Sequence, residues 1–255
     1  MALVNFPVLV FVFSLLALWV AALIGARLRS RRRNLDPAER EDLGVILAAS
    51  LTLLGLIIGF SFSMAVSRYD QRKNYEADEA NTIGTEYARA GLLPADDASK
   101  VREMLKCYLD QRIAFYAPPN RNQLVQINAQ TAQLQTSLWA AIEAAAKAQP
   151  TPVVALAVSG MNDVLNSEAY TQAAWWNRIP TAAWCLMIAI GLGCNVLVGY
   201  NARRPIDQQP QEFLILPLIV SIAFFLIAEM DSPRGGVVQI HPQNLESLAR
   251  SMHKP

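Results

Sequence analysis

Long apolar runs alternate with polar segments along the chain, and their lengths predict four membrane-spanning helices. The first run, Val8 to Ala26, contains no charged residue and as a helix can cross a hydrocarbon core of about 30 Å. The second run begins at Leu43, the third covers residues 179–200, and the fourth covers residues 213–228. Several arginines follow the first run, which is typical of a membrane helix and not of a cleaved signal peptide. The pattern therefore predicts an all-α membrane protein.

The segment between the second and third runs is polar, rich in alanine and poor in glycine. Pro94, Pro118 and Pro150 separate stretches in which apolar residues have helical spacing, and no alternating strand pattern occurs in the sequence. We therefore expect a helical-bundle domain between spans 2 and 3. The expected division of the chain is residues 1–66 for spans 1 and 2 with a basic loop at 27–42, 67–177 for the helical extramembrane domain, 178–230 for spans 3 and 4, and 231–255 for a C-terminal tail.

The second span continues without a helix breaker into a charged helix, and three sets of residues on it are candidates for function. A stripe of small side chains recurs at every fourth position, where another helix can approach closely: Gly55, Gly59, Ser63 and Ser67. A neighbouring row has the same spacing: Thr52, Leu56 and Phe60. Two arginines share a helix face just beyond the apolar part: Arg68 and Arg72. The spacing alone favours a bundle helix whose arginines anchor at the membrane surface over a pore-lining helix.

Several segments resemble known protein families. Residues 59–71 begin with Gly-Phe and place Arg68 at the same interval as the second transmembrane helix of the bestrophin anion channels, which they resemble. Residues 79–85 (Glu-Ala-Asn-Thr-Ile-Gly-Thr), 92–94 (Leu-Leu-Pro) and 230–236 (Met-Asp-Ser-Pro-Arg-Gly-Gly) resemble a bacterial family of membrane proteins with a bestrophin-like domain. This second resemblance covers most of the chain.

The resemblance implies a homo-oligomeric ion channel in the lipid bilayer, with small inorganic anions such as chloride as the permeant ions and five subunits by bestrophin precedent. Thr52, Leu56 and Phe60 fall on the positions of the hydrophobic constriction in bestrophins, so copies of Phe60 would form a pore neck. Thr52 departs from an all-apolar neck. Copies of Arg68 and Arg72 would form a positive pore mouth. The carboxylates that follow would weaken this charge by pairing with it: Asp70, Glu76, Asp78 and Glu79.

Composition and motif content argue against several other classes of function. Hydrophobic residues make up 53% of the chain and charged residues 17%, whereas about a quarter of a soluble domain is charged. The net charge of +1 lacks the basic excess of a nucleic-acid-binding protein. The sequence contains no phosphate-loop, nucleophile-elbow or zinc-helix motif, so we expect no catalytic residue, cofactor or enzyme activity. Glu229 and Asp231 lie where bestrophins carry an acidic calcium loop, but two carboxylates are too few for a metal site.

The distribution of arginine gives one prediction of orientation in the plasma (inner) membrane, and the resemblance gives another. The positive-inside rule places the loop between spans 1 and 2 and the loop between spans 3 and 4 in the cytoplasm. Their arginines are Arg27, Arg29, Arg31, Arg32, Arg33, Arg40, Arg203 and Arg204. The helical domain would then be extracytoplasmic. In bestrophins the domain between the second and third spans is cytosolic, so both orientations stay open.

A second hypothesis is a membrane sensor or scaffold whose helical domain binds a ligand or a partner. By the positive-inside count, the cytoplasmic loops are about a dozen to sixteen residues long and hold no output domain, which favours the channel. An enzyme acting at the membrane surface has no motif to support it.

Overall fold

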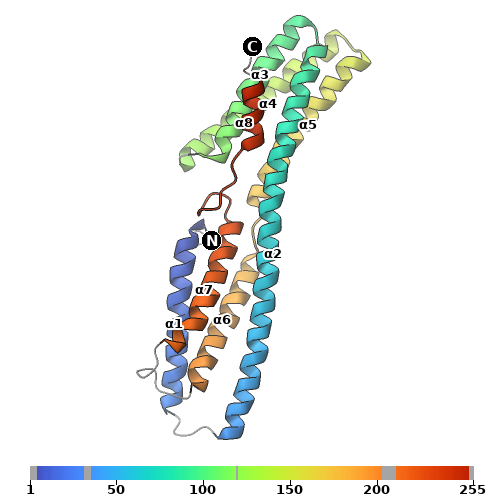
Figure 1. Cartoon of the computed structure of the whole chain (residues 1–255). Coiled ribbons are helices and arrows are strands. Elements are labelled where there is room, and N and C mark those ends of the chain that lie inside the picture. The colour runs from blue at the N-terminus through green and yellow to red at the C-terminus, as the bar shows by residue number, and fades with distance from the viewer. Residues whose placement is uncertain (1–4, 32–35, 119, 203–210, 253–255) are drawn as a thin grey trace. The chain divides into compact units, whose positions relative to one another are not determined.

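The computed structural model describes residues 5–31, 36–118, 120–202 and 211–252 (Figure 1). This described part of the chain is built from helices and contains no strand. The helices are α1 (Pro7–Arg31), α2 (Pro37–Arg89), the short 3-10 helix η2 (Ala90–Leu92), α3 (Ala95–Tyr116), α4 (Arg121–Ala148), α5 (Pro152–Trp176), α6 (Thr181–Asn201), α7 (Glu212–Asp231) and α8 (Gln243–Met252). Of the arginines used to predict orientation, those outside the described residues are Arg32, Arg33, Arg203 and Arg204.

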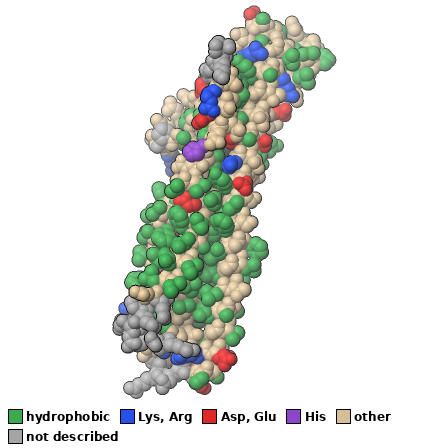
Figure 2. All heavy atoms as spheres, in the orientation of Figure 1, with side chains coloured by type: hydrophobic (Ala, Val, Ile, Leu, Met, Phe, Trp, Pro, Cys, Tyr) green, Lys and Arg blue, Asp and Glu red, His purple; other side chains and the backbone are tan. Residues whose placement is uncertain are grey.

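Four helical stretches among the described residues are long and apolar enough to cross a membrane. They are Pro7–Ser30, Pro37–Leu92, Pro152–Asn201 and Phe213–Asp231. Within the third stretch, α5 ends before α6 begins. The predicted all-α fold, with four membrane helices and a helical domain between spans 2 and 3, is confirmed. Figure 2 shows hydrophobic side chains over much of the visible surface of the apolar helices.

The first compact unit, called the membrane unit, consists of residues 1–69 and 178–239. In this unit α1 packs along α6 and α7 (Figure 1). Gly25 and Gly199 allow the backbones of α1 and α6 to approach closely, because a Cβ atom at either position would overlap a carbonyl oxygen of the other helix. The apolar core of the membrane unit also includes side chains from α2.

Asp231, at the end of α7, connects this end of the helix to the start of α6. Its carboxylate accepts hydrogen bonds from Nε of Arg178 (3.0 Å) and from the backbone N–H of Ile179 (2.9 Å). Glu229 accepts hydrogen bonds from the backbone N–H groups of residues 237–238, which shapes the loop after α7. Both carboxylates at this end of α7 therefore accept hydrogen bonds from N–H groups of the same chain.

The second compact unit, called the helical unit, consists of residues 70–177 and 240–255. In this unit α3 packs against α4 and α8, and α4 packs against α5. The extramembrane part of α2 and the adjoining η2 bury one stripe, in which the spacing alternates between four and three residues and so keeps to one helix face. The stripe consists of Arg72, Glu76, Glu79, Ile83, Glu86 and Ala90.

Helix α8 lies in the segment that the sequence assigns to a C-terminal tail, and Glu76 of α2 holds its first turn. One oxygen of Glu76 accepts the backbone N–H groups of Asn244 (2.9 Å) and Leu245 (3.0 Å), and the other accepts the amide of Asn244 (2.6 Å). A carboxylate at a helix N-terminus satisfies free N–H groups and interacts favourably with the helix dipole. Helix α8 is therefore attached to the helical unit.

Candidate functional site

The membrane part of α2, residues 43–66, is covered less by its own chain than the other membrane helices. Of its apolar stretch, 6% is buried inside the chain, against 22%, 33% and 44% for the first, third and fourth stretches. An apolar helix surface that its own chain leaves open contacts either lipid or another protein molecule. This open surface of α2 is the candidate functional site.

One face of the membrane part of α2 packs into the membrane unit. Leu54, Ser61 and Ala65 are buried, and their spacing places them on the same side of the helix. Leu54 and Ala65 belong to the apolar core that includes Trp184 of α6 and Phe224 of α7. The opposite face of the helix is therefore the one that the chain leaves uncovered.

The predicted neck row lies on this uncovered face. Thr52, Leu56 and Phe60 are all exposed, and the exposed fraction is 54% for Leu56 and 63% for Phe60. The hydroxyl of Thr52 donates a hydrogen bond to the carbonyl of Ala48 (2.9 Å), so its donor is satisfied within the helix. The row therefore presents an uncharged surface with no free donor. Its role as a pore lining stays a prediction.

The predicted packing stripe also lies on the uncovered face. Gly55, Gly59, Ser63 and Ser67 are exposed, and a Cβ atom added at Gly55 or Gly59 would meet nothing within 4 Å. Within the chain, the close helix approach instead uses the glycines of α1 and α6 described above. The stripe is thus available to a helix of another molecule.

The two arginines predicted at the pore mouth have different surroundings. Arg72 is fully buried, and its guanidinium donates to the carbonyls of Ala174 (3.1 Å) and Asn177 (3.2 Å) at the end of α5. A cation at this place satisfies carbonyls that the helix leaves free. Arg72 therefore does not lie on an open surface, which differs from the sequence-based expectation. Arg68 is partly buried, and its Nη1 has no hydrogen-bond partner among the described residues.

The carboxylate of Glu79 binds an arginine of another helix. Arg112 of α3 donates hydrogen bonds from Nε and Nη2 to Glu79, and the hydroxyl of Thr171 donates a third at 3.1 Å. Arg112 also lies 3.5 Å from Glu168 of α5. Burial disfavours the charge of Arg112, but the neighbouring Glu79, Tyr108 and Glu168 together outweigh this and raise the arginine pKa, so Arg112 stays charged. Glu79, which the sequence offers as a partner of the mouth arginines, makes these contacts inside the helical unit.

The spacing of the residues in this buried polar stripe can be read from the sequence. Arg72, Glu76, Glu79, Ile83 and Glu86 follow one another at intervals of four and three residues, so they share one helix face. A charged residue at a core-facing position requires a partner from another element. The partners themselves lie far along the chain, and the spacing on α2 does not name them.

A comparison with known families decides the family of the chain. The family described as the Bestrophin-like domain matches residues 8–245. The chain belongs to this family. The resemblance to this family that was inferred from residues 79–85, 92–94 and 230–236 is therefore confirmed. No curated protein matches its sequence.

Solved structures of bacterial bestrophin homologs share the fold of this bestrophin-like chain. A crystal structure of a homolog from Klebsiella pneumoniae has 14% sequence identity and a TM-score of 0.63, and the match covers 94% of this chain and 96% of that chain. A single-residue mutant of a Klebsiella pneumoniae homolog has 13% identity and a TM-score of 0.65, with 97% and 99% coverage. At these identities the likeness describes the fold.

Proposed function

We propose that this bestrophin-like protein is a homo-oligomeric ion channel that passes small anions, chloride among them, and that the uncovered face of α2 lines its pore. The proposal rests on the open surface of the membrane part of α2. Only 6% of the apolar stretch of this helix is buried inside the chain. Membership of the bestrophin-like family supports the same reading.

A pore requires several copies of the chain around an axis. One molecule contributes a single α2 helix with one outward apolar row, which cannot enclose a conduit. The small side chains at Gly55 and Gly59 allow the helices of neighbouring copies to approach closely, because nothing in the same chain occupies the space beside them. Bestrophin precedent suggests five copies.

The neck of the pore is formed by Leu56 and Phe60. Both side chains are exposed on the same face of α2, so each copy contributes them to the axis. A ring of apolar side chains hinders the passage of hydrated ions, while the edges of phenyl rings carry partial positive charge that favours anions. Thr52 adds a satisfied hydroxyl to this row.

Arg68 is the arginine that attracts anions to the end of the neck. Arg68 is only partly buried, whereas Arg72 is fully buried and is held by carbonyls of α5. Copies of Arg68 around the axis raise the local concentration of anions. Arg72 is therefore left out of the proposed mouth.

The proposal is tested by halide flux into sealed liposomes that contain the purified protein. Flux above that of empty liposomes is expected, and Phe60→Ala should raise it or relax selectivity because it widens the neck. Phe62→Ala is the matched control, since Phe62 is also exposed but lies on another side of α2. No flux from verified, oriented protein, or equal changes in the two variants, would contradict the proposed pore.

A further inference from the structure

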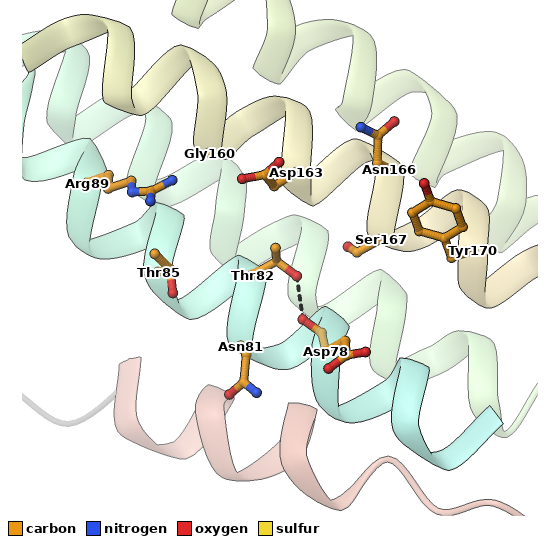
Figure 3. Close-up of a pocket in the computed structure, with 10 residues that line it drawn as sticks. All are labelled: Asp78, Asn81, Thr82, Thr85, Arg89, Gly160, Asp163, Asn166, Ser167 and Tyr170. Atoms are coloured by element: carbon orange, nitrogen blue, oxygen red, sulfur yellow. Dashed lines mark hydrogen bonds between the residues drawn. The ribbon is translucent and has the colours of Figure 1, made fainter. Parts of the chain in front are cut away.

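A polar pocket lies between α2 and α5 inside the helical unit (Figure 3). Its volume of about 540 Å³ falls within the range of sites for small molecules. The residues that line it are Asp78, Asn81, Thr82, Thr85 and Arg89 of α2 and Gly160, Asp163, Asn166, Ser167 and Tyr170 of α5. None of these residues belongs to the proposed pore.

The charges of the pocket favour a cation over an anion. Asp78 and Asp163 contribute two carboxylates, and Arg89 contributes one guanidinium. The hydroxyls of Thr82 and Ser167 donate to backbone carbonyls, so toward the pocket they offer lone pairs that accept hydrogen bonds. The lining is thus better supplied with acceptors than with donors.

Glu86 is a buried carboxyl directly behind the lining of the pocket, and Nη1 of Arg89 lies beside the same position of Gly160. Its side chain is 0% exposed, and neither carboxyl oxygen has a hydrogen-bond partner among the described residues. The carboxyl occupies the space that a side chain on Gly160 would fill, so it lies directly against a lining residue of the pocket. Burial raises the pKa of Glu86 to about 8, the nearby Arg89 lowers it and Asp163 raises it. A buried carboxyl without a donor is costly, and a bound N–H group would remove that cost.

The two pocket carboxylates lie at different levels along α2. Gly160 sits against Glu86, and Thr171 bonds to Glu79, so α5 runs antiparallel to α2 here, and Asp163 lies between these two levels, opposite Thr82 (Figure 3). The rise from Asp78 to Thr82 is about 6 Å at about 1.5 Å per residue. A linear molecule with a cationic group at each end can therefore approach both carboxylates.

A metal ion fits this arrangement poorly. Among the described residues, no group of three or more His, Cys, Asp or Glu side chains is placed to hold a metal. An ammonium group needs no such cage, because three N–H donors can bind a carboxylate together with hydroxyl or amide oxygens. The separated carboxylates thus suit two ammonium groups on one ligand.

From these observations we propose that the pocket between α2 and α5 binds a small linear diamine, with one ammonium group at Asp163 and the other at Asp78. The hydroxyl oxygens of Thr82 and Ser167, which Figure 3 shows between the two helices, accept the remaining N–H groups. This site goes beyond the proposed channel function and does not depend on it, because it is defined by residues of the helical unit alone.

The test is a calorimetric titration of the full-length protein in a neutral detergent with butane-1,4-diamine. Saturable binding is expected, together with binding at least about tenfold weaker for butan-1-amine, which has one charge, and none for butane-1,4-diol. Asp78→Asn and Asp163→Asn should each weaken diamine binding by about tenfold or more. Both aspartates are exposed, so the variants should fold normally, which circular dichroism checks.

Asp110→Asn is the matched control, because it removes an exposed carboxylate of α3 outside the pocket. This variant should bind the diamine like the unmodified protein. No binding of butane-1,4-diamine, equal binding of the monoamine, or equal losses in the pocket variants and Asp110→Asn would overturn the proposed site. Because the readout is binding and not ion flux, any of these results would leave the proposed channel standing.

Discussion

The membrane part of α2 and its extramembrane part belong to one continuous helix but bury opposite kinds of side chain. In residues 43–66 the buried positions include the apolar Leu54 and Ala65, and large apolar side chains such as Phe60 face outward. In residues 70–89 the buried positions include Arg72 and other charged groups. The first part can leave apolar groups outside because lipid or another copy covers them, whereas the second must pair its charges internally.

Because of this difference, the two parts of α2 are suited to different roles: contact with other molecules for the membrane part, and packing within the helical unit for the extramembrane part. The membrane part contributes few residues to the core of its own unit, so its outward face is free to serve an assembly. The extramembrane part is fixed by contacts with α3, α5 and α8, including those of Glu79 with Arg112 and Thr171. Substitutions in the two parts should therefore affect different properties of the protein.

The largest expected effect is that of Glu79→Ala on the stability of the helical unit. Removing Glu79 leaves Arg112 buried without its main partner, and breaking a buried ion pair in this way costs about 3–5 kcal/mol. Leu56→Ala, on the uncovered face, should change the stability of the chain by less than about 0.5 kcal/mol. Denaturant unfolding followed by circular dichroism measures both variants. Similar losses in the two would remove the distinction between the parts of α2.

The next effect contrasts two glycines of the membrane unit. Gly25→Leu should destabilise the fold by about 1–3 kcal/mol or more, because the side chain would overlap the backbone of α6. Gly59→Leu should leave the fold of one chain intact but weaken association, because the open space beside Gly59 is the proposed contact between copies. Native mass spectrometry reports the oligomer and thermal unfolding reports the fold. An unchanged oligomer in Gly59→Leu would argue against the stripe as a contact.

A smaller effect concerns the pH dependence of stability through Glu86. Burial raises the pKa of Glu86 to about 8 from its ordinary value of 4.5, so the folded state holds the proton more tightly and Glu86 should lower stability as pH rises from about 4.5 to 8. Glu86→Gln removes this loss. The melting temperature of the variant should match that of the unmodified protein near pH 5 and exceed it above pH 8 by about 2–4 °C, the shift given by about 1 kcal/mol. Parallel pH profiles for the two proteins would contradict the assigned environment of Glu86.

A labelling experiment that leaves stability unchanged can test on which side of the membrane the helical unit lies. Cys107 is exposed on α3 of the helical unit and can be labelled by a membrane-impermeant maleimide. The positive-inside rule predicts labelling from outside intact cells, and Cys107→Ser should abolish it. Labelling only after the membrane is opened would instead support the cytosolic domain of bestrophins.

The sequence predicted the membrane helices well, because these follow from local patterns along the chain. A long uncharged run can cross the bilayer as a helix without contacts from other parts of the chain. The helical period places Leu56 and Phe60 on one face, whatever packs against that face. The functional role assigned to this row rests on the family and stays a prediction.

The surroundings of the charged residues could not be predicted in the same way. Arg72 is held by carbonyls of residues 174 and 177, and Glu79 by Arg112, so each environment depends on elements distant along the chain. Spacing on α2 shows which residues share a helix face but identifies neither which face is buried nor the element that packs there. Glu86 is a similar case, since its confinement depends on the absence of a side chain at Gly160.

The most direct test of the pore is to modify its proposed neck chemically. Phe60→Cys would be made in a background without Cys107, Cys185 and Cys194, and halide flux into liposomes would be recorded before and after a charged, water-soluble thiol reagent. If Phe60 lies in the pore neck, modification at residue 60 should strongly reduce halide flux, and the same treatment of Phe62→Cys should change the flux little. Flux that is unaffected by complete modification at residue 60 would show that this face of α2 does not line the path of the ions.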